Sequence, residues 1–386
     1  MTHTRKKICI VATIPMSINV FMKPHIVMLA EKYDVTLIAN GAEEDFSALV
    51  GEYVRVIPVN IARAVLLLKD LLALMRLFKI FKDERFDAVH SITPKAGLLS
   101  MLAALAAGVP IRIHTFTGQV WANKSGVVRW GLKALDKLIA KCATGLLTDS
   151  FSQRLFLINE KIVQKEKIIV LGNGSVSGVD VERFKLNPAA RLRIRSGLAI
   201  PEHAIICLYL GRLNSDKGVQ DLAAAFASFA ANTPYAHLLV VGPDEGGMSE
   251  VLQKTLINCS KQYHRIGFTN KPEDYMAAAD IFCLPSYREG FGSVLIEAAA
   301  AGVPALASNI YGITDAVVNG QTGMLHEPKN VTQITEYLQK LIDDHALRQA
   351  MSVQGMARAK ELFATQVLVN AMRDYYAPLL REGASC

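Results

Sequence analysis

Leu284-Pro-Ser-Tyr-Arg-Glu-Gly-Phe-Gly-Ser-Val-Leu-Ile-Glu-Ala-Ala-Ala-Ala-Gly-Val-Pro304 carries the clearest signals of local structure in the sequence. The short apolar segment 281–284 predicts a strand that ends before Pro285. Two glycines in the middle of the stretch predict a loop, and the alanine-rich run that follows predicts a helix that Gly302 and Pro304 terminate. The stretch therefore predicts a strand, a loop and a helix in succession.

The predicted loop is suited to hold an anion. The first backbone N–H groups of the helix, at Gly292 and Ser293, lack partners within the helix, and the positive end of the helix dipole lies behind them. Two carboxylates flank this position, Glu289 in the loop and Glu297 one to two turns inside the helix. Since a carboxylate repels phosphate but accepts hydrogen bonds from sugar hydroxyls, the combination indicates a phosphate ester with a sugar on each side, such as a nucleotide-sugar.

Glycine-rich turns of this kind are also common in α/β proteins that bind nothing there. The segment Glu289-Gly-Phe-Gly-Ser-Val-Leu-Ile-Glu297 nevertheless resembles the Glu-x7-Glu motif of the retaining glycosyltransferases of family 4. The flanking segments Pro285-Ser-Tyr287 and Glu297-Ala-x-Ala-x-Gly302-x-Pro304 match that family as well. The resemblance covers nearly the whole chain, and it implies the α/β fold called GT-B, in which two Rossmann-like doubly wound domains face each other across a cleft.

The length and composition agree with two folded domains. The chain has 386 residues, of which 51% are apolar and 20% charged, as in an ordinary folded protein. We expect a first domain at residues 1–180, which binds the acceptor, and a second domain at 181–365, which binds the nucleotide-sugar. The turn-rich and then basic segment 172–200 is where we expect the hinge. By the resemblance, residues 366–386 form a helix that crosses back onto the first domain.

Both halves of the chain alternate short apolar runs with helical patterns, which predicts two parallel sheets covered on both faces. Ligands of such sheets bind beyond the carboxyl ends of the strands. The predicted strands are residues 7–13, 34–39, 53–59, 86–92, 109–115 and 145–148, and then 204–210, 237–241, 264–267, 281–284, 304–307 and 323–326.

The first predicted strand of the second half leads into Gly211-Arg-Leu-Asn-Ser-Asp-Lys-Gly218. Arginine offers a planar pair of N–H donors and lysine a point charge, and both suit diphosphate oxygens, although such a pair in a polar loop means little alone. The spacing resembles the family signature Gly-Arg-Leu-x-x-x-Lys-Gly, which implies that Arg212 and Lys217 clamp the diphosphate.

The same resemblance implies roles for three other residues. Glu297 corresponds to the partner of the ribose hydroxyls, and Glu289 to the catalytic carboxylate that faces the transferred sugar. The turn that ends at Phe268 falls where the family holds the base. No Asp-x-Asp occurs in the sequence, and the anion site consists of cations and a helix dipole. We therefore expect no metal and no cofactor apart from the donor, for which the family suggests a UDP-sugar.

In the first half, Thr93 is predicted to cap a helix whose first turn contains Pro94 and Lys95. A single histidine at the end of a strand is usually structural. The segments that begin at His90 (His-Ser-Ile-Thr-Pro-Lys-Ala-Gly) and at Ile113 (Ile-His-Thr-x-x-Gly) resemble a bacterial subgroup of family 4, however. In that family a histidine at this strand end contacts the transferred sugar, which implies a catalytic role for His114, with Lys95 as a substrate-binding candidate. The first loop, residues 13–19, lacks the family's Gly-rich turn, so we assign it no diphosphate contact.

The charge of the chain is unevenly distributed. Residues 1–180 contain 23 basic and 15 acidic residues, a net charge of +8, and residues 181–386 contain 19 and 20, a net charge of −1. No nucleic-acid signature accompanies the basic residues, so we expect no nucleic-acid partner. Two helical segments, 61–81 and 127–141, combine lysine and arginine with apolar residues. Arg129, Lys133, Lys137 and Lys141 form a stripe near Trp121 and Trp130, which indicates either contact with an anionic membrane or an ordinary solvated face.

The cysteines and the hydropathy pattern bear on the location of the protein. Six scattered cysteines, the last being Cys386, form no Cys-x-x-Cys pair, which fits a reducing cytosol. The sequence contains no apolar run of about 18 residues, and the short run after Lys7 is interpreted as a buried strand rather than a signal peptide. We expect a cytoplasmic protein that associates peripherally with the cytoplasmic face of the inner membrane.

The resemblance as a whole implies a retaining glycosyltransferase of surface-glycan assembly, of the O-antigen or capsule type. The expected donor sugar is an N-acetylated hexosamine or deoxyhexosamine, and the expected acceptor is a saccharide linked to polyprenyl diphosphate. Three alternatives remain open: a sugar-nucleotide 2-epimerase of similar fold, a glycosyltransferase with a soluble acceptor, and a carbohydrate-binding protein without activity. The intact set of Arg212, Lys217, Glu289 and Glu297 argues against the last alternative.

Overall fold

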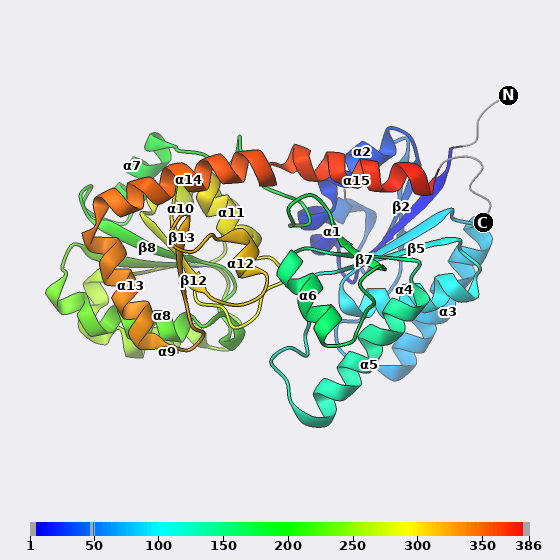
Figure 1. The fold of residues 1–386 in the computed structure, drawn as a ribbon, viewed down its shortest axis with the longest axis horizontal. Helices are drawn as coiled ribbons and strands as arrows, with labels where there is room; N and C mark the ends of the chain where they lie inside the picture. Colours follow the sequence, from blue (N-terminus) through cyan, green and yellow to red (C-terminus); the bar gives the residue numbers. More distant parts are fainter. Residues whose placement is uncertain (1–4, 47–48, 50, 381–386) are drawn as a thin grey trace. The chain divides into compact units, whose positions relative to one another are not determined.

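The computed structural model of the chain describes residues 5–46, 49 and 51–380. These residues form two compact units (Figure 1), which we call unit 1 and unit 2. Unit 1 comprises Met1–Ser177 and Thr365–Cys386, and unit 2 comprises Gly178–Ala364. The chain thus leaves unit 1 three residues before the expected boundary at 180, and it returns to unit 1 at the start of its last helix.

Within the described residues, the centre of unit 1 is a parallel sheet of seven strands in the order β3-β2-β1-β4-β5-β6-β7. The strands are β1 (Lys7–Val11), β2 (Asp34–Ala39), β3 (Val54–Pro58), β4 (Ala88–Ile92), β5 (Ile111–Phe116), β6 (Gly145–Thr148) and β7 (Ile168–Val170). Successive side chains point to opposite faces, so Cys9 packs into one apolar cluster and Ile10 into the other. Because both faces are covered, the central strands are continuous apolar runs.

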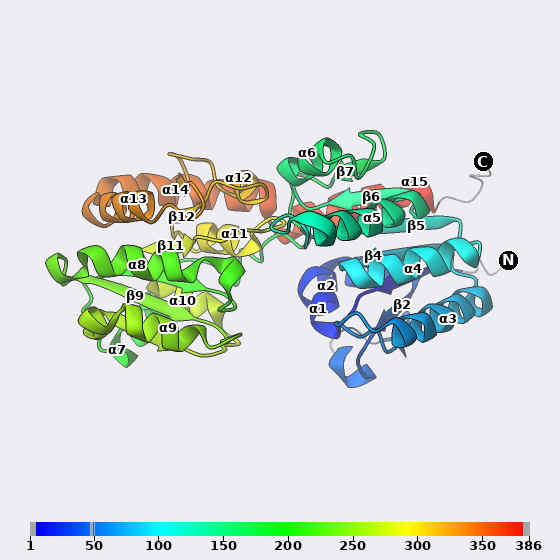
Figure 2. The same cartoon turned by 90° about the horizontal axis from the view of Figure 1, so that it is seen from below.

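Helices cover both faces of this sheet. They are α1 (Pro15–Phe21), α2 (Lys23–Ala30), the 3-10 helix η1 (Glu43–Phe46), α3 (Leu67–Glu84), α4 (Pro94–Ala106), α5 (Gly126–Cys142), α6 (Phe151–Asn159) and α15 (Thr365–Leu379). Helices α3 to α6 pack on one face, with α4 between α3 and α5 (Figure 2), and α1, α2 and α15 pack on the other. Helix α3 begins six residues later than the expected segment 61–81.

The last helix is fixed to the sheet of unit 1 by a buried polar network. The hydroxyl of Tyr376 in α15 and Nδ1 of His90 in β4 are 2.8 Å apart, and Nε2 of His90 lies 2.7 Å from the hydroxyl of Thr115. Burial lowers the pKa of His90 to about 3, so the imidazole is neutral and offers one donor and one acceptor. All three polar groups are thereby satisfied, and α15 is an integral part of unit 1.

Residues 178–364 are all described, and their centre is a parallel sheet of six strands in the order β10-β9-β8-β11-β12-β13. The strands are β8 (Ile205–Leu210), β9 (Ala236–Val241), β10 (Tyr263–Ile266), β11 (Ile281–Leu284), β12 (Ala305–Ser308) and β13 (Gly323–His326). The same alternation holds here, since Phe282 and Cys283 belong to the clusters on opposite faces.

The helices of unit 2 are α7 (Pro188–Gly197), α8 (Val219–Phe229), α9 (Met248–Thr255), α10 (Pro272–Ala278), α11 (Ser293–Ala300), α12 (Ile313–Ala316), α13 (Val331–Asp343) and α14 (His345–Phe363), with short 3-10 helices η2 (Ser215–Lys217), η3 (Ala230–Asn232) and η4 (Ile257–Gln262). Helices α7, α10, α11 and α14 pack together, and α8 packs with α9 and α13. The expected hinge segment, residues 172–200, lies mostly in unit 2. Within it, Arg195 of α7 is buried, with its Nη2 2.6 Å from Asp280 Oδ2.

Both sheets have the strand order of the doubly wound fold, in which the order reverses between two central strands. This switch point lies between β1 and β4 in unit 1 and between β8 and β11 in unit 2. All twelve strands expected from the sequence are present, and β7 was missed because three residues give no periodicity. The loops that follow β8 and β11 carry the motifs quoted above, so the fold places both at one sheet edge.

Two further features concern cysteines and hydropathy. Five cysteines lie in the described part of the chain, where all are buried and none forms a disulfide, and Cys386 lies outside it. Among the helices of the described residues, none is both long and apolar enough to cross a membrane.

Candidate active site

Three loops meet at the carboxyl edge of the unit 2 sheet because glycines allow close approach. Gly218, with φ of +62°, lies against the loop after β11, where a Cβ would come within 2.0 Å of the Pro285 carbonyl oxygen. Gly242, with φ of +139°, lies against the loop after β8, where a Cβ would come within 2.0 Å of the Gly211 oxygen. Any other residue would clash with backbone at both positions, so these glycines hold the loops after β8, β9 and β11 together.

An ion pair joins the two predicted motifs. Lys217 Nζ, from the loop after β8, lies 2.5 Å from Glu289 Oε1, from the loop after β11, and the two side chains are 20% and 14% exposed. The backbone N–H of Tyr287 donates to the Asp216 carbonyl at 2.8 Å, which fixes the two loops beside the pair. Lys217, which is predicted to bind the diphosphate, and Glu289, which is predicted to face the sugar, are therefore in direct contact.

Arg212 has a different partner. Its guanidinium lies 3.0 Å from Glu245 in the loop after β9, and the two side chains are 57% and 43% exposed. The backbone carbonyl of Arg212 accepts a hydrogen bond of 2.8 Å from the buried hydroxyl of Tyr209, which fixes the backbone at this residue. An exposed ion pair of this kind contributes little energy, so Arg212 can exchange Glu245 for a phosphate. Glu245 is a residue that the sequence motifs did not indicate.

Helix α11 begins at the expected position. Gly292 precedes it with a left-handed backbone, φ 72° and ψ 52°, and no side chain caps the first turn. Ser293 is the first helical residue and is half-buried. The N-terminal N–H groups and the positive end of the helix dipole are therefore not neutralised by a capping side chain.

Glu297 lies half-buried on α11, and burial raises the pKa of its carboxyl to about 7. Arg183 opposes this shift and Glu273 adds to it. These two neighbours are occupied with each other, because Arg183 Nη2 lies 2.8 Å from Glu273 Oε2. Among the described residues, no side chain or backbone group donates a hydrogen bond to the Glu297 carboxylate. Hydroxyl donors from a ligand would satisfy this carboxylate.

Phe268 lies in the loop after β10 and is 68% exposed. The start of this loop is held by Arg265, whose Nη2 lies 2.5 Å from the Gly242 carbonyl oxygen in the loop after β9. The exposed Phe268 ring therefore lies on a loop that is hydrogen bonded to the loop after β9, on the β10 side of the sheet.

In unit 1, His114 is 1% exposed near the end of β5, and its Nδ1 lies 2.8 Å from Ser91 Oγ. The imidazole lies against Gly97 of α4, where a Cβ would come within 2.3 Å of the ring. Burial lowers the pKa of His114 to about 3, so the ring is neutral. Within the described residues, its Nε2 has no hydrogen-bond partner and is available to a ligand.

His114 and Lys95 line the same cavity of about 340 Å³, which lies between α3, α4, α5 and the loop after β5. Lys95 does not point freely into it, because its Nζ lies 2.6 Å from Asp70 and donates to the carbonyl of Ala64. The prediction that Thr93 caps α4 is wrong. Its φ is +77°, and its hydroxyl bonds to the hydroxyl of Thr13 at 2.8 Å, which joins the loops after β1 and β4.

Asp136 also lines this cavity, and the sequence motifs did not indicate it. It is 8% exposed, and its Oδ2 accepts a hydrogen bond of 2.6 Å from the indole N–H of Trp121. Burial raises the pKa of Asp136 to about 6. It is the only acidic residue between positions 126 and 142, and such an isolated acidic residue in a basic helix is a signal that sequence reasoning can use.

Two of the four basic residues in the expected stripe on α5 form ion pairs within unit 1. Arg129 and Lys133 bind Glu160 at 2.7 and 2.6 Å, within unit 1, and both lie over the face of Trp121. Trp121 itself is 1% exposed, so the expectation that it contacts a membrane is wrong. Lys137, Lys141 and Trp130 are exposed, and they remain candidates for such a contact.

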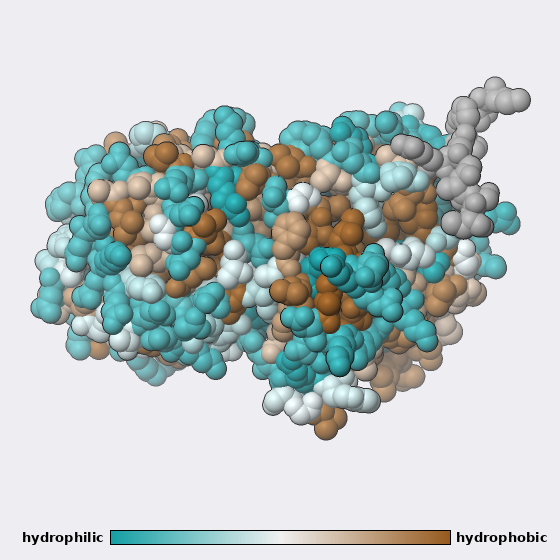
Figure 3. Space-filling view, in the orientation of Figure 1, coloured by the Kyte–Doolittle hydropathy of each residue, from teal (hydrophilic) through white to brown (hydrophobic). Residues whose placement is uncertain are grey.

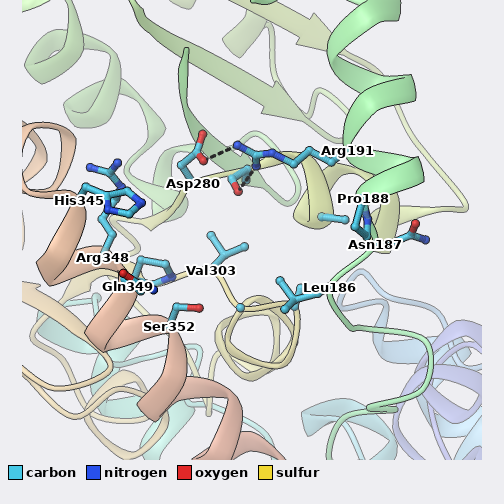
Figure 4. Close-up of a pocket in the computed structure, with 15 residues that line it drawn as sticks. Leu186, Asn187, Pro188, Arg191, Asp280, Val303, His345, Arg348, Gln349 and Ser352 are labelled. Atoms are coloured by element: carbon cyan, nitrogen blue, oxygen red, sulfur yellow. Dashed lines mark hydrogen bonds and ion pairs between the residues drawn. The ribbon is translucent and has the colours of Figure 1, made fainter. Parts of the chain in front are cut away.

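A second cavity, of about 400 Å³, lies at the opposite edge of the unit 2 sheet (Figure 4), where Asp280 and Pro304 precede β11 and β12. Its cations are bound to the protein itself. Arg191 pairs with Asp280 at 2.7 Å, and Arg348 donates to the carbonyls of Leu341 and Ile342. This cavity is separate from the motifs, and we assign it no part in the site.

Two doubly wound units, with the motif loops at the switch point of the second, have the fold of the GT-B glycosyltransferases. Solved structures of similar fold agree. Anabaena HepE in complex with UDP and glucose has a TM-score of 0.81 at 16% identity, with 97% of this chain and 100% of that chain covered. WaaG, described as a glycosyltransferase involved in lipopolysaccharide biosynthesis, has a TM-score of 0.75 at 19% identity, with 95% and 99% covered.

Sequence comparisons define the family. The model of glycosyl transferases group 1 matches residues 190–358, and the model of the glycosyl transferase 4-like domain matches residues 27–174. The capsular polysaccharide biosynthesis glycosyltransferase CapM of Staphylococcus aureus is 31% identical over 379 residues, 98% of both chains. The UDP-Gal:alpha-D-GlcNAc-diphosphoundecaprenol alpha-1,3-galactosyltransferase of Escherichia coli is 30% identical over 397 residues, also 98% of both chains. The chain belongs to the family 4 glycosyltransferases, among the bacterial enzymes of surface-glycan assembly.

Proposed function

We propose that this enzyme transfers a sugar from a UDP-sugar to a saccharide linked to polyprenyl diphosphate, with retention of the anomeric configuration. The observation that carries the proposal is the Lys217–Glu289 pair in the loops beside the N-terminus of α11. A cation, a carboxylate and a helix dipole then serve one ligand that contains both diphosphate and sugar. The E. coli relative, which is named for UDP-Gal and a diphosphoundecaprenol acceptor, supports the choice of UDP and of a lipid-linked acceptor.

The proposed reaction exchanges one carbon–oxygen bond for another and moves one proton. An acceptor hydroxyl oxygen bonds to the anomeric carbon of the donor while the bond from that carbon to the UDP oxygen breaks, and the hydroxyl proton passes to the departing diphosphate. Negative charge grows on the diphosphate, where Lys217, Arg212 and the N–H groups at the start of α11 stabilise it. The Lys217 ammonium has three donors, so it can hold Glu289 and the diphosphate together.

Two other residues of unit 2, Glu297 and Phe268, are suited to bind the nucleoside. Glu297 is proposed to accept hydrogen bonds from the ribose hydroxyls, which supply the donors that its half-buried carboxylate lacks among the described residues. The exposed ring of Phe268 offers an apolar face to the base. Glu289, held by Lys217, is proposed to act on the transferred sugar.

Unit 1 is proposed to bind the acceptor and to contribute one contact with the transferred sugar. His114, neutral and with Nε2 available, is proposed to hydrogen bond a hydroxyl of the transferred sugar, and Lys95 to bind phosphate in exchange for Asp70. The proposed sugar is an N-acetylated hexosamine or deoxyhexosamine, in glycans of the O-antigen or capsule type.

We also propose that unit 1 docks peripherally on the anionic cytoplasmic face of the inner membrane. Large apolar side chains are exposed on α3 and α5, and apolar surface is visible at this part of unit 1 (Figure 3). On α3, Leu67, Leu68 and Leu72 are 82%, 79% and 61% exposed, and on α5, Val127 and Trp130 are 84% and 73% exposed. Exposed basic residues accompany them: Lys69, Arg76, Lys79, Lys82, Lys137 and Lys141. Apolar and basic side chains together suit a lipid surface with anionic headgroups.

A screen of nucleotide-sugars tests the proposal. The purified enzyme is incubated with each donor, with and without a bacterial lipid extract, and release of nucleoside diphosphate is measured. We expect UDP release from one UDP-sugar only when the lipid extract is present. Conversion of the donor to an isomer without lipid would identify an epimerase instead, and release with a water-soluble saccharide alone would identify a soluble acceptor.

A further inference from the structure

The cavity beside His114 is lined mainly by apolar side chains. Its walls are side chains of α3, α4, α5 and the loop after β5, namely Val65, Leu67, Leu98, Leu99, Phe116, Val120, Trp121, Leu132, Leu135 and Ile139. Its volume of about 340 Å³ falls within the range of small-molecule sites. The polar residues that also line it are Arg63, Asp70, Lys95, His114, Thr115, Thr117 and Asp136. A saccharide, with a hydroxyl on nearly every carbon, would face mainly apolar side chains in such a cavity, whereas an apolar chain would match them.

The mouth of the cavity is continuous with the exposed apolar surface. Val65, Leu67 and Leu135 line the cavity and are also 79%, 82% and 41% exposed. Leu68, Leu71 and Leu72 extend the apolar surface along α3 from this mouth, and Leu138 extends it along α5. The exposed apolar surface therefore leads to the mouth of the cavity, where an apolar chain would meet apolar side chains.

Basic groups stand at the same mouth. Arg63 and Lys95 both line the cavity, and Arg63 is exposed, with no ion pair to any described residue. Lys95 is bound to Asp70, the residue whose carboxylate also accepts a hydrogen bond from the backbone N–H of Leu66. A phosphate at the mouth would meet two cations and one carboxylate, Asp70, so the net positive charge there fits a molecule with an apolar chain and an anionic head.

We propose that this cavity binds the isoprenoid chain of the acceptor, next to its phosphate, with the phosphate held by Arg63 and Lys95. The inference rests on the proposed function, which supplies the lipid-linked acceptor. It goes further because it locates the isoprenoid chain in unit 1. It also implies that binding of the acceptor depends on contacts with this chain, in addition to attachment of the enzyme to a membrane.

A tryptophan in the cavity lining allows ligand binding to be measured by fluorescence. Trp121 lines it, and the only other tryptophan, Trp130, is 73% exposed on α5. In a Trp130→Phe variant, tryptophan fluorescence comes from Trp121 alone. We expect farnesyl phosphate, below its micelle concentration, to change this fluorescence with saturation, and glycerol phosphate to leave it unchanged. Dodecyl phosphate should bind at least several-fold more weakly, and equal or tighter binding of that straight chain would overturn the isoprenoid assignment.

Two substitutions on one helix separate the cavity from the surface. Leu135→Glu places a charge in the mouth, whereas Leu138→Glu places the same charge on a residue of similar exposure, 37% against 41%, outside the cavity lining. In the Trp130→Phe background, we expect Leu135→Glu to raise the Kd for farnesyl phosphate by about tenfold or more, and Leu138→Glu by less than about twofold. Equal effects of the two substitutions would overturn the proposal.

The transfer reaction then separates this inference from the proposed function. With acceptors that differ only in isoprenoid length, we expect KM to fall as the chain lengthens, in detergent as well as in membranes. Transfer with the same KM for every chain length would overturn the role of the cavity and leave the proposed function standing. No transfer to any lipid-linked acceptor, together with saturable farnesyl phosphate binding, would contradict the proposed function and retain the cavity as a lipid phosphate site.

Discussion

At the scale of single residues, partners decide what the motif residues can do. Lys217 and Glu289 are held 2.5 Å apart and are mostly buried, whereas Arg212 is more than half exposed beside Glu245. The two predicted diphosphate-binding cations are therefore a largely buried lysine and an exposed arginine. The sequence motif treats the two cations alike, and the structure distinguishes them.

Replacing Lys217 by alanine is expected to weaken UDP binding by roughly 1.5 to 3 kcal/mol, because a charged hydrogen bond is lost and Glu289 is left without its cation. Arg212→Ala should fall at the lower end of that range, since Arg212 is 57% exposed. Calorimetric titration with UDP measures both effects. Lys185→Ala is the matched control, because Lys185 is an exposed lysine of unit 2 paired only with Glu182 at 3.2 Å. Unchanged affinity in both site variants would remove the clamp.

Glu289→Gln is expected to lower kcat by on the order of a hundredfold while UDP affinity stays within about threefold, because Glu289 is proposed to act on the sugar during the reaction. Steady-state kinetics and UDP titration on the same preparation give the two numbers. A parallel loss of UDP affinity would make Glu289 a binding residue instead.

Asp136 gives a prediction about pH. Burial raises the pKa of its carboxyl from 3.8 to about 6, so the folded protein takes up a proton between about pH 4 and pH 6 that the unfolded chain does not. The contribution of this carboxyl to the free energy of unfolding is therefore fully present at low pH and is lost as the pH rises through about 6.

Asp136→Asn removes this dependence and keeps an oxygen for the indole N–H of Trp121. Relative to the parent protein, the variant should be more stable at about pH 7.5 than at about pH 4.5, by on the order of 2 kcal/mol. Urea unfolding followed by Trp121 fluorescence in the Trp130→Phe background reports on unit 1. The same difference between the two proteins at both pH values would show that Asp136 does not titrate as described.

At the scale of elements, periodicity and turn signals predict which segments form strands and helices, but they do not predict side-chain partners. The strands at the two switch points and the start of α11 were all predicted from sequence. The basic stripe of α5 was predicted as one surface, yet two of its cations bind Glu160 from the end of α6. Glu160 lies about thirty residues from them in the sequence, and no local pattern reveals such a contact.

The membrane prediction therefore moves to the exposed side of α5. Replacement of Lys137 and Lys141 by Gln, with Trp130→Ser, should lower binding to anionic liposomes by about thirtyfold or more, since each lysine contributes about 1 kcal/mol near an anionic leaflet. Co-sedimentation at low and high salt measures the effect, because salt shortens the range of the attraction. Lys254→Gln, which changes a 75% exposed lysine of α9, is the control. Equal sedimentation of the triple variant and the parent protein would exclude this face of α5 from membrane binding.

At the scale of the whole molecule, the sequence predicted two α/β units of one topology and the family to which they belong. It could not show that Lys95 is engaged by Asp70, or that an apolar cavity adjoins His114, since both depend on how α3, α4 and α5 pack. The charge difference between the two halves can be counted directly from the sequence.

The proposed site also predicts how the whole enzyme responds to chelation. Because Lys217, Arg212 and the start of α11 supply the positive charge for the diphosphate, transfer should proceed at the full rate after exhaustive treatment with EDTA. Assays with and without added Mg²⁺ or Mn²⁺ measure this. Activity that is lost with EDTA and recovered only with a divalent ion would show that metal takes part.

The proposed reaction transfers a sugar from a UDP-sugar to a lipid-linked saccharide. The most direct measurement follows radiolabelled sugar from the UDP-sugar into the organic-solvent phase of a reaction with bacterial lipid extract, for the parent enzyme and Glu289→Gln. We predict label in the lipid phase with the parent enzyme, about a hundredfold less with the variant, and the same anomeric configuration in product and donor by NMR. Label that stays in the aqueous phase for every UDP-sugar tested, or a product of inverted configuration, would contradict the account.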